Sequence, residues 1–312
     1  MKTRIIIIVF ILLTAFILYG VLIKAVFHKE IKINSSIPVI HREISSLDKI
    51  AKWFVPYSSV DTNTNKIIKQ GSLEYTNASL QITKVVGFSA WYQVVENKRS
   101  ENFLFEVMPD TGHYATVRLS YKNTFWNEIF GTNEIINNAV KSLQNLKDYL
   151  ADNKKMYGYD IEMISVTDTA FLFTSKVVAN PAKKASFKNL FESLIKFAEL
   201  KNLGYNGVRI FYTLPYGKDS IHLFTSIGIT KPEDAPFTGD FTLKRMPYMG
   251  KLLKSYYQGN FGNVISALDA IAQFESDNGM NSMAIPFVKL ITEGIEFDDS
   301  QIIQANALYP VY

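Results

Sequence analysis

Aromatic residues in the C-terminal half of the chain have the side chains and positions best suited to bind a small molecule. Five of them fall at the ends of expected strands or at a strand-to-helix junction: Tyr212, Tyr216, Tyr256, Tyr257 and Phe261. Such side chains offer large, flat apolar surfaces, and tyrosine adds a hydroxyl at the tip. They predict capture of a planar or amphipathic ligand. The alternative is that they are core and rim residues of a chain that is 13% aromatic.

Two basic residues would decide the charge preference of such a site. Arg209 and Lys289 lie at near-equivalent positions of two similar segments. If both side chains point inward, the site favours an anion, and if both point outward, they belong to solvated strand faces. The sequence leaves both possibilities open.

Motifs for catalysis or cofactor binding are absent from the sequence. It has no phosphate-binding loop, dinucleotide-binding turn, nucleophile elbow or zinc-binding helix motif, and it has no cysteine. Four histidines lie far apart, without carboxylates at metal-ligand spacing: His28, His41, His113 and His222. An acidic cluster fits a solvated connection better than a cation site: Glu293, Glu296, Asp298 and Asp299. We therefore expect no catalytic residue, no metal and no cofactor.

The charge balance argues against nucleic acid as a partner. The formal net charge is +4, and the lysines and arginines are scattered rather than gathered on one helix. With 312 residues, of which 47% are hydrophobic, the chain is long enough for two packed domains and one further segment.

A repeated pattern in the C-terminal half would position the aromatic and basic residues. The order strand, helix, strand, strand occurs over residues 170–229 and again over 248–309. In each helix the apolar residues fall at i, i+3, i+4, i+7 and i+8. Gly204 and Gly279 are placed to end the two helices. Two similar β-α-β-β halves would leave a groove between them, and grooves are where small molecules bind.

The N-terminal half has a different order of elements. An expected strand at 30–34 and a helix at 39–54 precede alternating, strand-like runs between residues 66 and 122. A long amphipathic helix follows at 134–151, and the polar run 152–159 is the expected linker. This order predicts an α+β module built from a curved sheet and a long terminal helix.

The first residues of the chain predict a membrane span. Residues 5–23 are uncharged and overwhelmingly apolar, and as a helix they would cover the hydrocarbon thickness of a bilayer. The small-residue exit of a cleaved signal peptide is not evident. We therefore expect a single-pass anchor over residues 1–28 in the cell membrane, with the rest of the chain on the non-cytoplasmic side.

The N-terminal module resembles a known family. The opening Ile33-Asn34-Ser35-Ser36, the spaced apolar residues that end at Trp53, and the step Pro56-Tyr57 resemble START-like (SRPBCC, polyketide-cyclase-like) helix-grip domains. The helix segment 142–147 is similar to the last helix of that family, whereas Ser36 replaces its usual proline. The resemblance implies a START-like domain over 29–155. Three residues are candidates to line its cavity or simply to pack its core: Trp53, Trp91 and Phe105.

Residues 158–312 resemble the gyrase-inhibitor-like (GyrI-like) effector-binding domain, itself a duplication of β-α-β-β units. The resemblance is carried by the junction Tyr256-Tyr257-Gln258-Gly259-Asn260-Phe261 and by the ending Leu308-Tyr309-Pro310-Val311. It implies ligand binding in the groove between the halves. Some members are hydrolases that depend on a groove glutamate, but the similar strand in this chain has Val288 and Lys289 where that carboxylate would lie.

Taken together, these features predict an α+β fold with a transmembrane helix, a helix-grip START-like domain and a duplicated β-α-β-β (GyrI-like) domain, an arrangement associated with bacteria. The expected function is non-catalytic binding of a small, partly apolar ligand by a membrane-anchored protein. Two alternatives stay open. One is a GyrI-like hydrolase with a relocated carboxylate, such as Glu293 or Glu296, and the other is an inhibitor module that binds a protein partner.

Overall fold

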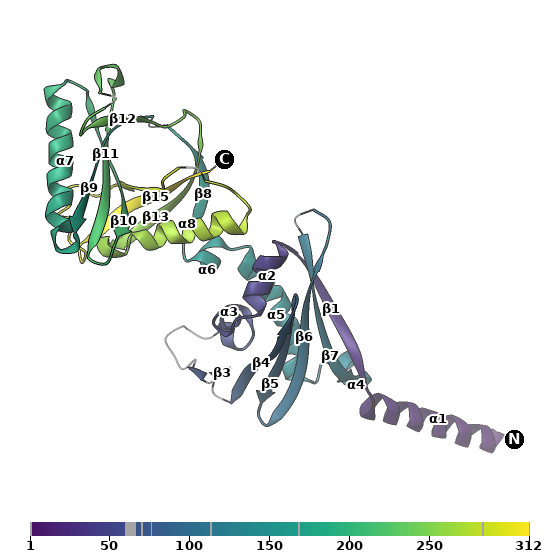
Figure 1. The fold of residues 1–312 in the computed structure, drawn as a ribbon. Helices are drawn as coiled ribbons and strands as arrows, with labels where there is room; N and C mark the ends of the chain where they lie inside the picture. Colours follow the sequence, from purple (N-terminus) through teal and green to yellow (C-terminus); the bar gives the residue numbers. More distant parts are fainter. Residues whose placement is uncertain are drawn as a thin grey trace. The chain divides into compact units, whose positions relative to one another are not determined.

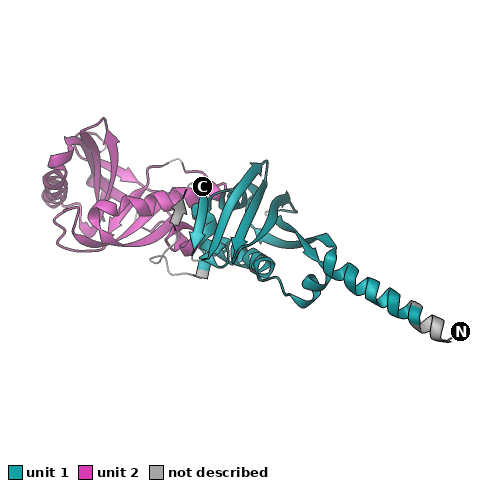
Figure 2. Cartoon of the chain, turned by 90° about the horizontal axis from the view of Figure 1, so that it is seen from below, with its two compact units in different colours: residues 1–152 teal, residues 153–312 magenta. Residues whose placement is uncertain are grey.

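The chain divides into two compact units, each with its own antiparallel sheet. The computed structural model describes residues 2–59, 67–69, 71–75, 77–112, 114–167, 169–236, 238–282 and 284–311, so His113 lies outside the described residues. Unit 1 is Met1–Asp152 and unit 2 is Asn153–Tyr312 (Figure 2). The architecture is α+β in both units.

Unit 1 contains a seven-stranded sheet in the order β1-β7-β6-β5-β4-β3-β2 (Figure 1). Its strands are β1 (Lys24–Asn34), β2 (Ile67–Lys69), β3 (Ser72–Tyr75), β4 (Ala78–Val86), β5 (Ser89–Glu96), β6 (Arg99–Pro109) and β7 (Tyr114–Thr124). Its helices are α1 (Lys2–Leu22), α2 (Ile37–Ile44), α3 (Leu47–Trp53), α4 (Phe125–Phe130) and α5 (Glu134–Leu150). From β2 to β7 each strand pairs with its neighbour in the chain, and β1 forms one edge of the sheet by pairing with β7.

The core of unit 1 lies between the sheet and the helices α2, α3 and α5. Side chains alternate along β5 and β6, so that one face of each strand is buried. On that face the Trp53 ring lies 5.8 Å from Phe105, and the Phe54 ring lies 6.0 Å from Tyr92. Helix α5 begins where the Asn133 side chain accepts a hydrogen bond from the backbone N–H of Ile136.

The prediction of a membrane anchor is wrong. Across the residues that the structure describes, no helix combines the length and the apolar character that crossing a bilayer requires. This finding overturns the span over residues 5–23, the anchor over 1–28, the membrane as a partner and the single-pass localisation on the non-cytoplasmic side. The apolar run does form helix α1, but its C-terminal part packs on α4. There Phe16 contacts Trp126 ring to ring at 5.7 Å, and Trp126 Nε1 donates a hydrogen bond to the carbonyl of Ile17 at 3.0 Å.

Unit 2 contains an eight-stranded sheet in the order β12-β9-β11-β10-β14-β15-β13-β8 (Figure 1). Its strands are β8 (Ile161–Ser165), β9 (Ala170–Ala179), β10 (Tyr205–Tyr216), β11 (Ser220–Ile229), β12 (Thr242–Arg245), β13 (Lys251–Asn260), β14 (Phe287–Leu290) and β15 (Ile302–Val311). Its helices are α6 (Asn153–Tyr157), α7 (Lys183–Leu200) and α8 (Ile265–Asp277). The order strand, helix, strand, strand occurs twice, as β9-α7-β10-β11 and β13-α8-β14-β15, with β12 and β8 added at the two edges.

Helices α7 and α8 cover the same face of this sheet. One core cluster joins buried residues of both helices to residues of the strands, among them Phe187 of α7, Leu268 of α8 and Val288 of β14. Helix α8 ends as predicted at Gly279 (φ 63°), a left-handed conformation that glycine adopts without steric cost. The prediction that Gly204 ends α7 is wrong, because the left-handed residue after its C-cap is Asn202 (φ 52°) and Gly204 (φ 69°) lies two residues further on. The opposite face of the sheet carries a second, smaller cluster. We call it the helix-free face, because neither α7 nor α8 contributes to that cluster.

The two halves of unit 2 meet along β10 and β14. The paired residues there are Ile210 with Lys289 and Phe211 with Val288. On its other side β14 pairs with β15, which places Lys289 opposite Asn306. We call this line of pairing the seam. It makes one continuous sheet from the two halves.

Candidate functional site

A pocket of about 190 Å³ lies on the helix-free face of unit 2, at the seam. Both halves and the edge strand β8 contribute to its wall: Ile164, Ser165, Val166, Thr167, Phe171, Ile210, Met246, Leu252, Lys254, Phe287, Lys289, Asn306 and Leu308. Its size is comparable to that of an engineered apolar cavity of roughly 150 Å³ that binds benzene. The pocket is therefore large enough for a small organic molecule.

The floor of the pocket is apolar because of the alternation of side chains along each strand. Ile210, Phe287 and Leu308 point to the helix-free face and belong to the smaller cluster. Their neighbours Phe211 and Val288 point to the opposite face and belong to the main core. Every strand at the seam therefore gives one set of residues to the core and the other set to the pocket.

The polar groups of the pocket are two lysines and an amide. Lys254, Lys289 and Asn306 are half-buried, and the register of the strands places Lys289 beside Asn306. Lys254 Nζ lies 2.8 Å from Glu162 Oε1, an ion pair across β13 and β8 in which the glutamate side chain is mostly exposed. Among the residues that the structure describes, no carboxylate lines the pocket; residue 168, which follows Thr167, lies outside them. The wall therefore combines an apolar floor with positive charge at its side.

A row of aromatic rings continues from the pocket along the helix-free face. Phe173 lies two residues after Phe171 on β9 and therefore shares its face. Its ring centroid is 6.3 Å from that of Phe224, which in turn lies 4.1 Å from His222 and 6.2 Å from Tyr212. Lys244 Nζ lies 5.3 Å from the Phe173 ring centroid, a cation–π contact. This face thus offers flat apolar surface beside positive charge.

Of the residues predicted to bind a ligand in this half, Lys289 lines the pocket. Tyr212 lies in the aromatic row, and it also packs against the main core. Burial raises the pKa of its hydroxyl above the ordinary value. Tyr216 and Tyr256 are exposed, at the end of β10 and on β13, and neither lines the pocket.

Tyr257 and Phe261 lie in the main core, on the helix-covered face. Tyr257 donates a hydrogen bond from its hydroxyl to the carbonyl of Asn260 at 2.6 Å. The Phe261 ring lies 5.4 Å from that of Phe211. Both rings therefore lie on the face opposite to the pocket, Phe261 against Phe187 of α7 at 5.7 Å and Tyr257 near Tyr159 at 6.5 Å.

Arg209 and Lys289 do not share a face. Lys289 is paired with Ile210, and both line the pocket. Arg209 precedes Ile210, so its side chain leaves β10 on the other face. There it donates a hydrogen bond from Nη2 to the carbonyl of Thr292 at 3.4 Å. Lys289 therefore lines the pocket, whereas Arg209 hydrogen-bonds to the segment after β14.

The aromatic residues predicted to line a cavity in unit 1 occupy two different environments. Trp53 and Phe105 are fully buried and contact each other in the core. Trp91 points to the other face of β5, where it is half-buried and lies under Lys84 Nζ at 5.2 Å. The first two residues meet in the core between the sheet and the helices of unit 1, and Trp91 does not join them.

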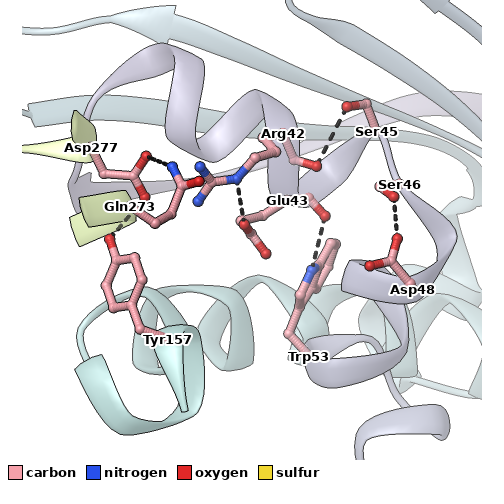
Figure 3. Close-up of polar contacts among 9 residues, drawn as sticks. All are labelled: Arg42, Glu43, Ser45, Ser46, Asp48, Trp53, Tyr157, Gln273 and Asp277. Carbon is pink, nitrogen blue, oxygen red and sulfur yellow. Dashed lines mark hydrogen bonds and ion pairs between the residues drawn. The ribbon is translucent and has the colours of Figure 1, made fainter. Parts of the chain in front are cut away.

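A buried glutamate in unit 1 did not enter the sequence-based prediction. Glu43 of α2 is fully buried, and its Oε1 accepts a hydrogen bond from Arg42 Nε at 3.0 Å (Figure 3). Trp53 Nε1 donates to the Glu43 carbonyl at 3.2 Å. The signal was available, because Glu43 falls three residues after Ile40 on the apolar side of its helix. Figure 3 also shows a contact within unit 2, where the Tyr157 hydroxyl donates to Asp277 Oδ2 at 2.9 Å.

The pocket itself depends on residues that sequence reasoning missed. Lys254 and Asn306 lie on strands that were expected, but their sequence gave no sign of a shared wall. The segment from Ile164 to Thr167 belongs to the short edge strand β8 and the residues after it. One signal was present in the sequence. Lys254 is a charged residue between Leu253 and Ser255 in an expected strand, which indicates that its side chain points to the face opposite to theirs.

Comparison with known proteins gives similarities of fold at low sequence identity. No known protein-family profile matches the chain, and no curated protein matches it. The C-terminal domain of EcmrR is 13% identical, with a TM-score of 0.37 over 49% of this chain and 98% of that domain. EcmrR in an EcmrR–DNA complex is 12% identical, with a TM-score of 0.36 over 59% of this chain and 74% of that one. An uncharacterised conserved protein from Listeria innocua is 15% identical, with a TM-score of 0.34 over 53% and 98%. Values this low assign neither a ligand nor a partner to this chain.

Proposed function

We propose that this protein binds a small, partly apolar molecule without transforming it, in the pocket on the helix-free face of unit 2. The observation that carries the proposal is the composition of the wall, an apolar floor from both halves with a few polar groups beside it. This combination is typical of ligand sites, because apolar contact supplies affinity and a few polar groups fix the orientation.

The proposal includes a GyrI-like effector-binding role for unit 2 and a START-like helix-grip role for unit 1. The repeated order β9-α7-β10-β11 and β13-α8-β14-β15 supports the first, together with a pocket between the two repeats. The packing of the long helix α5 against β1 and β7 supports the second. In unit 1, the buried pair Trp53 and Phe105 would form the inner wall of any ligand site between sheet and helix.

The acidic residues considered as relocated catalytic bases lie away from the pocket. Lys188 pairs with Glu296, Lys184 with Asp298 and Lys183 with Asp299, which places this acidic segment beside α7 on the helix-covered side. Glu293 follows β14 and does not line the pocket. None of these carboxylates is in reach of a molecule bound on the helix-free face, so no observation favours a hydrolase.

Filling the pocket would test the proposal. Asn306 is half-buried in the wall and alternates with the core residues Ala305 and Ala307, so an Asn306→Trp substitution would place an indole ring in the pocket. Ser220→Trp is the control, because Ser220 is a half-buried polar residue on β11 that does not line the pocket. In a screen of small aromatic and aliphatic molecules by thermal shift and ligand-observed NMR, wild type and Ser220→Trp should share hits that Asn306→Trp loses. Hits that survive in Asn306→Trp, or no hits for wild type, would contradict the proposal.

A further inference from the structure

We infer that residues 291–301 form a strap that opens as a unit, and that the space its Phe297 ring leaves is a second binding site, for a flat apolar aromatic molecule. The strap joins β14 to β15 and contains neither a helix nor a strand. Phe297 belongs to the main core on the helix-covered face of unit 2. The site is therefore distinct from the pocket and goes beyond the proposed function.

The Phe297 ring fills a slot formed by aromatic rings of α7 and of the junction that precedes α8. It is 3% exposed and stacks on Phe187 at 5.3 Å and on Phe191 at 5.5 Å, with interplanar angles of 17° and 10°. Phe261 meets it edge to face at 5.7 Å and 80°. Stacked and edge-to-face contacts are the arrangements that aromatic rings prefer. A free aromatic molecule can make the same contacts once the Phe297 ring has left the slot.

The backbone of the strap opposes the closed state. Phe297 has φ 59°, a left-handed conformation that is uncommon for a bulky residue and costs free energy. Gly294 has φ 63°, and a Cβ built on it meets no atom within 4 Å. When the strap leaves the slot, both residues can adopt other conformations. Opening therefore loses the burial of one ring but gains backbone freedom.

Ion pairs at the surface hold the strap on α7. Their carboxylate side chains are 47% to 66% exposed, so dissolved salt screens these pairs. The pairs, with their N–O distances, are Lys183 with Asp299 (2.7 Å), Lys184 with Asp298 (3.2 Å) and Lys188 with Glu296 (3.6 Å). The strap should therefore open more readily as the salt concentration rises.

Two backbone amides that lie far apart in the sequence would report the opening together. The Gly262 N–H donates a hydrogen bond to the carbonyl of Asp299 at 3.0 Å. The Glu296 N–H donates to Oε1 of the Gln301 side chain at 2.9 Å. Both acceptors belong to the strap, so movement of the strap out of the slot breaks both bonds.

Amide hydrogen exchange of the full chain, followed by NMR, tests the opening. In the wild type, Gly262 and Glu296 should have similar protection factors, at least about tenfold below that of Leu194, a fully buried residue of α7. Raising the NaCl concentration from about 0.05 to about 0.5 M should lower the protection of Gly262 and Glu296 several-fold and change that of Leu194 little.

A glycine substitution changes the closed strap without adding a contact. Gly294→Ala should lower the protection of Gly262 and Glu296 by about tenfold, because a side chain disfavours the left-handed backbone. Gly279→Ala is the matched control. Gly279 has the same φ of 63°, and a Cβ built on it also meets no atom within 4 Å, but it follows α8 and lies outside the strap. This control should leave both protection factors within about twofold of wild type.

Benzene and cyclohexane are matched probes of the slot, one flat and one puckered. Phe297→Ala removes the resident ring and should bind benzene about tenfold more tightly than cyclohexane, as measured by ligand-observed NMR. Benzene should also bind Gly294→Ala more tightly than wild type, since the slot is open in a larger fraction of the molecules. Asn306→Trp fills the pocket on the opposite face, so binding that persists in Phe297→Ala/Asn306→Trp is assigned to the slot.

The possible results separate this inference from the proposed function. Equal protection of Gly262, Glu296 and Leu194 in the wild type, or equal effects of the two glycine substitutions, would overturn the opening of the strap. Loss of benzene binding in the double variant would overturn the second site and support the pocket. If Phe297→Ala does not fold, the benzene affinities of Gly294→Ala and wild type decide, and equal values would overturn the inference.

Discussion

The two faces of the unit 2 sheet have opposite designs, although the same strands build both. On the helix-covered face, Phe187, Phe211, Phe261 and Phe297 meet with ring centroids 5.3 to 5.7 Å apart. On the helix-free face, a small apolar cluster leaves space beside it, and lysines border that space. Because side chains alternate along a strand, one set of residues in this sheet packs the core and the other set lines the pocket. Substitutions on one face can therefore change stability with little effect on the other face.

The largest expected effect is on the helix-covered face. Phe187 is fully buried and contacts four other phenylalanine rings. We expect Phe187→Ala to lower the free energy of unfolding by about 3–5 kcal/mol, since it removes a large side chain that its surroundings cannot replace. Phe173→Ala, on the helix-free face, should cost about 1 kcal/mol because its ring is half-exposed. Urea unfolding of both variants measures the contrast, and equal losses would contradict the separation of tasks.

An intermediate effect is expected at the floor of the pocket. Leu308 is buried but borders open space, so Leu308→Ala should cost about 2 kcal/mol, near the lower end for such substitutions. The same change enlarges the pocket and should improve the binding of a larger aromatic molecule, such as anthracene, relative to naphthalene. Chemical unfolding and calorimetry measure the two effects. A stability loss as large as that of Phe187→Ala would show that the floor is part of the main core.

A smaller effect is expected where a predicted ligand residue turned out to face the core. Tyr257→Phe removes the hydrogen bond to the Asn260 carbonyl and should cost about 1 kcal/mol. Because Tyr257 does not line the pocket, the affinity of the variant for any small molecule that binds there should stay within about twofold of wild type. Thermal unfolding and one titration check this pair of expectations. A large loss of affinity at unchanged stability would place the ligand on the other face.

The smallest effect concerns pH and the acidic segment beside α7. Hydrogen bonds from Ser300, together with the Lys184 ammonium group, lower the pKa of Asp298 to about 2. Because the folded pKa lies below the ordinary value of 3.8, Asp298 stabilises the fold above that value, and the contribution is lost as the pH falls through about 2. Asp298→Asn should therefore unfold at a lower temperature than wild type at pH 7, and the difference should shrink to a small part of that as the pH approaches 2. A difference that stays as large at pH 2 as at pH 7 would rule out this cause.

Much of unit 2 could be predicted from the sequence because its helices carry regular apolar spacing. The helical residues Phe187, Phe191 and Leu194 are buried in the structure, as are Val264, Leu268 and Ile271. The face on which Phe261 lies could not be predicted, because it follows the last residue of β13, where strand alternation ends. The face of Tyr257 does follow the alternation of β13, in which Leu253, Ser255 and Tyr257 are buried on one side, but the sequence alone did not show which side carries the helices.

A groove between the repeats was predicted, and the structure has a pocket at the seam, but most of the residues that line it were not predicted. The seam between two repeats follows from the duplication, and Lys289 was among the expected residues. Residues from short edge strands were not, because strands such as β8 and β12 give almost no periodic signal. At the other end of the chain, an apolar run counted along the sequence predicted a membrane span, although part of that helix packs against Trp126. Such contacts between distant segments are invisible to a local count.

Only two residue pairs are recorded between β10 and β14, so hydrogen exchange at these strands could report whether the pocket holds a ligand. The pairs Ile210 with Lys289 and Phe211 with Val288 join β10 to β14, so the backbone hydrogens there exchange with solvent when the repeats move apart. A guest that contacts Ile210 on one side and Leu308 on the other opposes this motion. Slower deuterium uptake by the backbone amides of β10 and of β14 would then show that the pocket is filled. The protein would need no label, and the amides of either repeat would show the effect.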